Sequence, residues 1–271
     1  SGIGIGVPGQ VLADTRRGLS GGDVDLSGID FADLMEQRTG LPVTIENDAA
    51  MALLGEAAHG AARGLGNVVM LTIGTGIGGA VLERGRLLRG RGTAGQLGHL
   101  TVVQGGRQCV CGRRGCVETE SSGTAFGVHL AEAGLPPGTR AEELLARSGD
   151  PLADAVLTAW ATPLRAAIDT LIATCAPDLV VLGGGAGSAA AAALRRVPAP
   201  ASWFEAPVVA AGLGSDAGII GAAMAALPRR KRAVLVNGVP ASGKSQVARA
   251  LSAATGWHVL ALDTVKTPFL A

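Results

Sequence analysis

"NVVMLTIGTGIGGAVLERGRLLRG", residues 67–90, is the stretch that decides the fold class of this chain. Its apolar runs predict strands at 67–73 and 78–83, joined by the turn Gly74-Thr75-Gly76 and followed by a hairpin at Arg84-Gly85. Backbone N–H groups exposed at such a turn can bind phosphate, but glycine turns after strands are common in any α/β fold. The stretch therefore predicts a sheet with a candidate phosphate turn at its edge.

Strands and helices alternate on either side of this stretch. A strand is expected within 2–11 and another at 43–46, before a polar turn at Asn47-Asp48. A strand within 177–187 runs into a second glycine turn, Gly183-Gly184-Gly185. Helices are expected at 30–40, from about 49 onward, at 123–134, at 140–148, at 151–175 with an interruption at Pro163, and at the end of 207–227. This order predicts an α/β fold with a largely parallel or mixed sheet.

The composition limits the class of protein. The 271 residues suffice for one large domain or two smaller ones, and the core must be aliphatic because aromatic residues make up only 3%. A net charge of +1 gives no support to a nucleic-acid partner. No signal peptide opens the sequence, and the most apolar stretch, 206–227, is broken by Asp216 and falls short of a membrane span. We expect a soluble cytoplasmic protein without a membrane partner.

Three of the four cysteines and one of the four histidines lie within residues 98–116, "GHLTVVQGGRQCVCGRRGC". His99, Cys109, Cys111 and Cys116 form the closed set of one imidazole and three thiolates that structural zinc prefers. The alternatives are three buried free cysteines or a redox pair, although the Cys-x-Cys spacing differs from that of a thioredoxin-type pair. A site with four protein ligands has no open position for a substrate, so zinc here would be structural.

A basic run at 228–232, "PRRKR", has the composition of a solvated linker. The segment 238–245, "GVPASGKS", then follows a predicted strand and precedes a predicted helix, as in a P-loop. In that motif Gly238 and Gly243 shape the loop, Lys244 reaches the β- and γ-phosphates, and Ser245 holds Mg²⁺. Residues 233–271 are therefore expected to begin a second, P-loop domain, and they resemble the start of small P-loop kinases.

Six motifs in order resemble the ROK family of sugar kinases and related repressors. They are "GIGIGVPG" (2–9), "ENDA" (46–49), "LTIGTGIGGAV" (71–81), "GTAGQLGH" (92–99) followed by "CVCGRRGCVE" (109–118), "PDLVVLGGG" (177–185) and "LGSDAGIIGAA" (213–223). The resemblance implies the actin-like, ribonuclease-H-like two-lobed ATPase fold for residues 1–227. It also implies that the family's first phosphate-binding hairpin and the opening strands of its first lobe lie before Ser1.

The resemblance implies roles for the matching residues. Asp48 would be the general base that takes the proton from the 6-hydroxyl of the sugar as it attacks the γ-phosphate of ATP, whereas its position alone favours the cap of a helix. Asn47, His99 and Glu118 would hydrogen-bond sugar hydroxyls. The family usually has glutamate where this chain has Gln96, and an amide cannot make the charge-assisted bond of a carboxylate, which leaves the identity of the sugar open.

The nucleotide and zinc would lie on either side of these residues. Gly74-Thr75-Gly76 would hold the phosphates of ATP with Mg²⁺, and Gly184-Gly185 would lie on the adenosine side. The resemblance also places zinc on His99 and the three cysteines of the loop, where it would fix His99 and Glu118 toward the sugar.

These observations predict an ATP-dependent kinase of a hexose or N-acetylhexosamine, with sugar and ATP as partners and a homodimer as the assembly to test. A sugar-responsive repressor of the same family, which carries a DNA-binding helix-turn-helix, is the alternative. A zinc-braced binding module without turnover is a third. Asp48 and the following P-loop favour the kinase, because a sensor needs neither.

Overall fold

The computed structural model describes residues 2–12, 16–19, 30–147, 149–227 and 253 of the chain. The chain divides into two compact units, Ser1–Pro228 and Arg229–Ala271. The predicted linker at 228–232 lies outside the described residues, as does the P-loop with Gly238, Gly243, Lys244 and Ser245. The described helices and strands, from Ile3 to Ala226, lie in the first unit.

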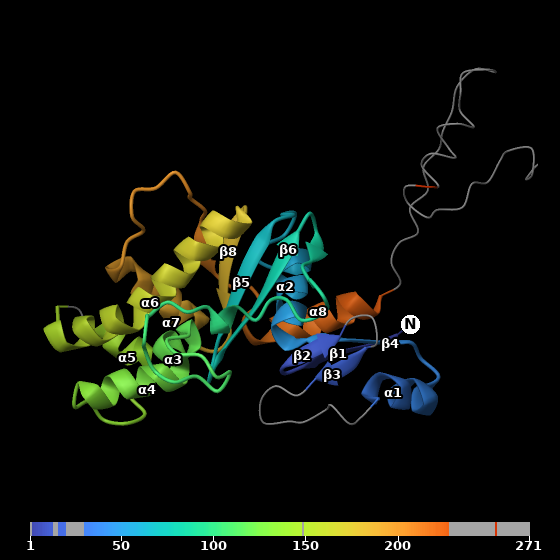
Figure 1. Ribbon diagram of the computed structural model, residues 1–271, viewed down its shortest axis with the longest axis horizontal. Helices are drawn as coiled ribbons and strands as arrows, with labels where there is room; N and C mark the ends of the chain where they lie inside the picture. The colour runs from blue at the N-terminus through green and yellow to red at the C-terminus, as the bar shows by residue number, and fades with distance from the viewer. Residues whose placement is uncertain (1, 13–15, 20–29, 148, 228–252, 254–271) are drawn as a thin grey trace, which may run out of the picture. The chain divides into compact units, whose positions relative to one another are not determined.

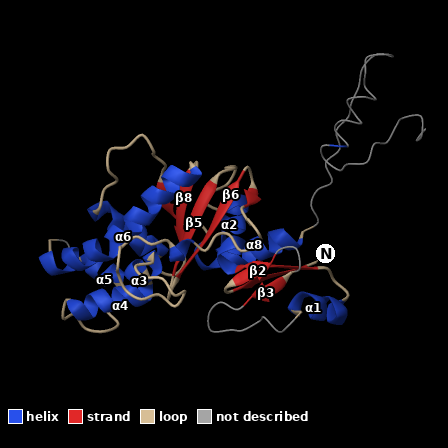
Figure 2. Cartoon of the chain, viewed as in Figure 1, coloured by secondary structure: helices blue, strands red, loops and turns tan. Residues whose placement is uncertain are grey.

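A five-stranded mixed sheet forms the centre of this unit (Figures 1 and 2). Its strands are β5 (Val68–Ile73), β6 (Ile77–Glu83), β7 (Arg86–Leu87), β8 (Leu179–Gly183) and β9 (Val208–Ala210). In the order β7-β6-β5-β8-β9, β6 runs antiparallel to β5 whereas β8 and β9 run parallel to it. The predicted mixed α/β sheet is thereby confirmed.

The side chains of β5 alternate between two hydrophobic clusters, as the period of a strand requires. Val69, Leu71 and Ile73 face a large cluster that includes the long helix α6 (Pro151–Cys175). Val68 and Met70 face a smaller cluster on the other side of the sheet. Helices therefore cover both faces of the sheet. A ligand can reach the sheet only at the ends of its strands.

Helices α2 (Asp48–His59) and α8 (Ala217–Ala226) pack against each other and against the sheet. They approach so closely that a methyl group on Gly55 would clash with the carbonyl of Ala217. The same helices contact a second, two-stranded sheet of β1 (Ile3–Val7) and β4 (Val43–Asn47), so they lie between the two sheets (Figure 1).

A buried carboxylate joins α2 to the segment that leads into α8. Glu56 is fully buried and accepts hydrogen bonds from the backbone N–H groups of Ala61 at 2.7 Å, Gly212 at 3.0 Å and Leu213 at 2.8 Å. Three donors satisfy a carboxylate that has no cation beside it among the described residues. Glu56 thus fixes the C-terminal part of α2 against the segment that leads into α8.

The remaining elements complete the first unit. They are β2 (Gln10–Leu12), β3 (Arg17–Leu19), α1 (Phe31–Thr39), α3 (Val117–Ser121), α4 (Gly123–Glu132), α5 (Ala141–Ala146) and α7 (Gly187–Ala193), with 3-10 turns at Leu97–His99, Leu194–Arg196 and Gly214–Asp216. Among the described residues, no helix has the length and apolar character needed to cross a membrane.

The predicted interruption at Pro163 is wrong, because α6 runs through it without a break. A proline inside a helix removes one hydrogen bond and costs about 3 kcal/mol. Helix α6 buries ten apolar residues in the core, which outweighs that cost several times over. The helix also anchors the region before it, since the Trp160 indole donates to the carbonyl of Ser122 at 2.9 Å.

Candidate active site and metal centre

The strand β4 passes directly into α2, so the predicted turn at Asn47-Asp48 does not exist. Asn47 ends the strand and caps the helix: its Oδ1 accepts from the N–H groups of Ala49 at 3.0 Å and Ala50 at 3.2 Å. Its Nδ2 donates to the carbonyl of Gly9 at 2.8 Å, which leaves one amide hydrogen for another partner. Asp48, the first helical residue, is exposed, and the capping role considered for it belongs to Asn47.

The start of β6 brings three predicted site segments together. A Cβ on Gly78 would lie 3.1 Å from the Cβ of Ala49, the residue after the predicted base. A methyl group on Gly98, the residue before the predicted histidine ligand, would clash with the carbonyl of Ile77. Glu118 Oε2 accepts a hydrogen bond from the N–H of Ile77 at 2.9 Å. The segments that carry the predicted base, the histidine and the glutamate therefore meet at one point.

The two predicted nucleotide turns lie at the same edge of the central sheet. Gly74-Thr75-Gly76 follows β5 and Gly184-Gly185 follows β8, and these strands are parallel neighbours with Thr72 opposite Gly183. The N–H of Ala186 donates to the carbonyl of Ile73 at 2.9 Å, which holds one turn against the other. Thr75 and both glycines of the second turn are exposed or half-buried. Ligands of open α/β sheets bind at this edge, beyond the carboxyl ends of parallel strands.

The first turn is held from the side of α4. The N–H of Gly123 donates to the carbonyl of Gly74 at 2.7 Å, and the Thr124 hydroxyl donates to the carbonyl of Thr75 at 2.8 Å. Glu118 binds the other end of the same turn through Ile77. The turn is thus fixed before any ligand arrives, and the segment that comes after the cysteine loop does the fixing.

The ligand atoms of His99, Cys109, Cys111 and Cys116 all lie within 4.8 Å of one another. His99 Nδ1 and Cys109 Sγ are 3.5 Å apart, and the sulfurs of Cys111 and Cys116 are 3.7 Å apart. Around zinc, bond lengths of about 2.3 Å to sulfur and about 2.0 Å to nitrogen give tetrahedral edges of about 3.8 Å between sulfurs and about 3.5 Å between nitrogen and sulfur. The two separations of 3.5 Å and 3.7 Å match these edges, and all four cysteines of the chain are free thiols.

The environment of the thiols differs from one to the next. Burial, followed by hydrogen bonds to the thiols of Cys111 and Cys109, raises the pKa of Cys116 to about 12. Burial also raises the pKa of Cys109, whereas the backbone N–H of Arg113 lowers the pKa of the exposed Cys111. The two buried thiols therefore keep their protons at neutral pH unless a cation displaces them, as metal binding to thiols does.

A second set of contacts supports the cysteine loop. The Arg107 guanidinium donates to Glu120 at 2.7 Å and to Glu132 at 2.9 Å, and the Arg107 backbone N–H donates to Glu120 at 3.0 Å. Glu120 is almost fully buried, so this pair is shielded from water. The loop is consequently attached to α3 and α4 independently of the four predicted ligand residues.

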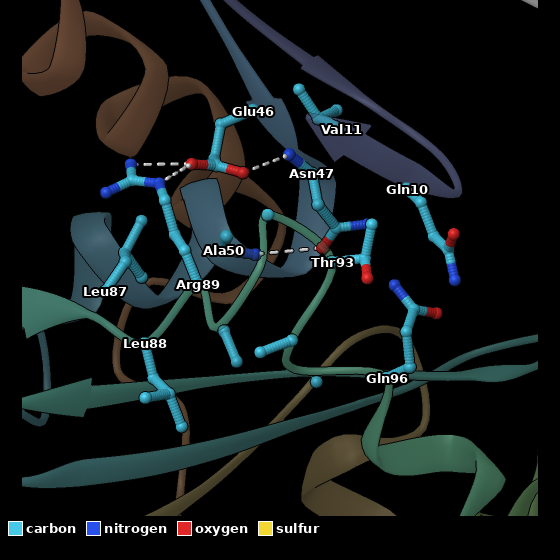
Figure 3. Close-up of a pocket in the computed structure, with 14 residues that line it drawn as sticks. Gln10, Val11, Glu46, Asn47, Ala50, Leu87, Leu88, Arg89, Thr93 and Gln96 are labelled. Atoms are coloured by element: carbon cyan, nitrogen blue, oxygen red, sulfur yellow. Dashed lines mark hydrogen bonds and ion pairs between the residues drawn. The ribbon is translucent and has the colours of Figure 1, made fainter. Parts of the chain in front are cut away.

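A pocket beside Asn47, the residue before the predicted base, has an empty volume of about 370 Å³, open solvent at its mouth included (Figure 3). Of the predicted sugar-binding residues, Asn47 and Gln96 line it, whereas Asp48, His99 and Glu118 do not. Its lining residues are Gln10, Val11, Glu46, Asn47, Ala50, Gly79, Ala80, Leu87, Leu88, Arg89, Gly92, Thr93, Ala94 and Gln96.

Three polar residues of this pocket were not predicted from the sequence. The carboxamide of Gln10 faces that of Gln96 across the opening (Figure 3). Glu46 and Arg89 form an ion pair on the opposite wall, at 2.7 Å. The position of Gln10 directly after the Pro8-Gly9 turn was the available signal for the first; nothing in the spacing of Glu46 and Arg89 indicated that they meet.

Comparisons with known proteins agree with this arrangement. A model of the ROK family matches residues 1–229. The glucokinase of Thermotoga maritima is 37% identical over 249 residues, which cover 82% of this chain and 77% of that protein. The N-acetylmannosamine kinase of Citrobacter koseri is 36% identical over 229 residues, which cover 82% and 77%.

A solved structure shows the same fold. The crystal structure of a ROK family glucokinase from Streptomyces griseus, in complex with glucose and AMPPNP, is similar with a TM-score of 0.71 and 33% identity. The likeness covers 83% of this chain and 80% of that one. The described fold is thus that of the ROK sugar kinases, which is actin-like. This chain belongs to the ROK family, and it is a sugar kinase.

Proposed function

We propose that this kinase transfers the γ-phosphoryl group of ATP to the 6-hydroxyl of a hexose or N-acetylhexosamine, with Asp48 as the general base. One observation carries the proposal: the exposed carboxylate begins α2 where that helix contacts the start of β6, the strand that follows the phosphate turn. A carboxylate there can accept the hydroxyl proton while the hydroxyl oxygen attacks phosphorus. Proton acceptance by a positioned base contributes about 10²- to 10⁴-fold in rate.

The nucleotide would bind along the edge formed by the two glycine turns. Gly74-Thr75-Gly76 would offer backbone N–H groups to the phosphates, and Gly184-Gly185 would lie beside the adenosine. Mg²⁺ bound with ATP would neutralise charge on the phosphates. Phosphoryl transfer depends mainly on position and charge neutralisation, and the first turn is already fixed by Gly123 and Thr124.

The sugar would be held from both sides of Asp48. Asn47 has one amide hydrogen left for a hydroxyl, and Gln96 can donate and accept. Glu118 uses one oxygen for the N–H of Ile77, so its other oxygen is the one we assign to a sugar hydroxyl. The relatives named for glucose and for N-acetylmannosamine support a neutral hexose or its N-acetylated derivative as the substrate class.

We assign zinc to His99, Cys109, Cys111 and Cys116, because their spacing fits a tetrahedral ion. The role would be structural. His99 turns Nδ1 toward the thiols, which leaves Nε2 as the nitrogen for a sugar hydroxyl. Zinc would also orient Cys116, the residue that caps α3, and thereby Glu118 two positions later. The pattern of 238–245 continues to suggest a P-loop domain after the kinase.

The alternatives have weaker support. A repressor has no use for a base at position 48, and the compared curated relatives are kinases. A zinc-braced binding module would explain the cysteine loop but neither glycine turn.

The test is ADP release by the full-length protein in a coupled assay over a panel of hexoses and N-acetylhexosamines. We expect one or a few sugars to give turnover, with product phosphorylated at the 6-position by NMR. Sugar binding by calorimetry without ADP release from any sugar would contradict the kinase and favour the repressor or the binding module.

A further inference from the structure

We propose that the ion pair of Glu46 and Arg89 is a positioning device that holds residues 89–96, and with them Gln96, over the sugar site. Glu46 Oε2 accepts both Nε of Arg89 at 3.0 Å and Nη2 at 2.7 Å (Figure 3). A guanidinium that donates two hydrogen bonds has a fixed direction as well as a charge. The inference rests on the proposed function, which places the sugar beside Asn47 and Gln96.

Glu46 is attached to the catalytic end of β4. It is 8% exposed, and its second oxygen accepts from the N–H of Asn47 at 3.1 Å. The carboxylate therefore holds Arg89 with one oxygen and the backbone of the next residue with the other. A change at Glu46 is transmitted to the residue that we assign to the sugar and that caps the helix of the base.

Arg89 is attached to the loop in the same two-sided manner. Its carbonyl accepts from the N–H groups of Gly92 at 2.7 Å and Ala94 at 3.1 Å, so the loop folds back on Arg89 itself. Two residues after Ala94 comes Gln96, which is directly followed by the 3-10 turn Leu97–His99. The backbone of Arg89 thus sets where the loop begins its course toward the predicted sugar ligands, and the ion pair with Glu46 holds Arg89 in place.

The pair also joins two separate sheets. Glu46 lies on β4 of the two-stranded sheet, whereas Arg89 follows β7, the edge strand of the five-stranded sheet. Both residues line the pocket that holds Asn47 and Gln96 (Figure 3). The width of that pocket therefore depends on the distance that this ion pair fixes between the sheets.

Stability alone does not explain a charge pair at this position. Replacing a buried ion pair by apolar side chains is often neutral or stabilising, whereas removing one partner leaves a buried charge without compensation. The Arg89 side chain is 40% exposed and the Glu46 side chain 11%, so loss of Arg89 affects the fold more than loss of the Glu46 charge. A variant that removes Arg89 and one that also removes the Glu46 charge should therefore differ in melting temperature. Melting temperature can be measured separately from the KM for sugar.

The test uses Arg89→Met, the double variant Glu46→Gln/Arg89→Met, and Arg91→Met as the matched control in the full-length protein. Arg91 is exposed in the same loop and forms no ion pair among the described residues. Melting temperature and the KM values for sugar and ATP are measured for each. The parent must first phosphorylate the sugar; if it does not, the proposed function fails and not this inference.

We expect Arg89→Met to raise the KM for sugar at least about tenfold while the KM for ATP changes less than about threefold, since a small displacement of a positioning group weakens only the ligand it faces. The double variant should regain the melting temperature, because no unpaired carboxylate remains, but not the KM for sugar. A double variant that regains both, or an Arg89→Met enzyme with the sugar KM of Arg91→Met, would overturn the inference. If Arg89→Met does not fold, the KM for sugar of the double variant is compared with that of Arg91→Met. Equal values would overturn the inference.

Discussion

Loss of the assigned zinc is expected to weaken catalysis more than folding. The change is Cys111→Ser, because Cys111 is the exposed ligand and its replacement leaves the packing of the two buried thiols unaltered. Cys175→Ser is the matched control: it makes the same substitution at a cysteine outside the cluster, at the end of α6.

The structure limits the effect on stability. Zinc would close the segment from His99 to Cys116, and a cross-link over about 18 residues restricts the unfolded chain by about 3 kcal/mol. From loop closure alone, at about 2–4 °C per kcal/mol for a unit of this size, the melting temperature should fall by about 6–12 °C. The contacts of Arg107 with Glu120 and Glu132 remain, so the kinase unit should stay folded.

The effect on catalysis should be larger. His99 and the helix that carries Glu118 would lose their common anchor, and a displacement of about 1 Å at a site can cost about 10²-fold in rate. We expect kcat/KM for the sugar to fall by about 10²-fold, which corresponds to about 2.7 kcal/mol. Zinc content by elemental analysis, thermal melting and steady-state kinetics measure the three quantities. A parent enzyme that is active without zinc, or a Cys111→Ser variant that behaves as Cys175→Ser in all three, would refute the reasoning.

Three further outcomes are expected. Gln96→Glu should change the KM for the sugar, or the preference among sugars, more than the KM for ATP, as a substrate panel would show; equal changes would indicate a role in closure or stability. Glu56→Gln should lower the free energy of unfolding by about 1–3 kcal/mol, because an amide leaves one buried N–H donor unsatisfied, and urea unfolding beside the exposed Glu83→Gln measures it. Apparent zinc affinity should rise with pH, and the proton of the Cys116 thiol alone should contribute about tenfold per pH unit. The reason is that its pKa is raised to about 12, so zinc must displace this proton at every pH below that value. An affinity that stays constant from about pH 6 to 8 in competition with a chelator would contradict this.

Local patterns were enough to predict the central strands and, to within one residue, the helix that begins at Asp48. Alternating apolar residues and a glycine turn specify β5 and β6 wherever they lie in the fold, because both signals are contained in the segment itself. The predicted interruption at Pro163 was wrong because the decisive signal is not contained in the segment itself. The burial that keeps α6 continuous comes from distant segments, which no local pattern reports.

In the candidate site, too, local patterns predicted some residues, whereas contacts between distant segments were missed. The four proposed ligand residues could be chosen from one loop, since soft ligands close in sequence are recognisable by type. Helix α3, only five residues long, was not predicted, and without it the bond between Glu118 and the N–H of Ile77 could not be foreseen. The ion pair joins Glu46 on β4 to Arg89, which lies 43 positions later, just after β7 of the other sheet. Such contacts depend on topology, so only the structure reveals them.

The most direct test of the proposed mechanism is the turnover of Asp48→Asn in the full-length protein. The amide keeps the size of the side chain and some of its hydrogen bonding but cannot accept the hydroxyl proton. We predict that sugar binding measured by calorimetry stays within about threefold of the parent, while kcat falls by about 10²- to 10⁴-fold. A variant whose kcat remains within about tenfold of the parent would contradict the assignment, because a general base is normally worth more than that.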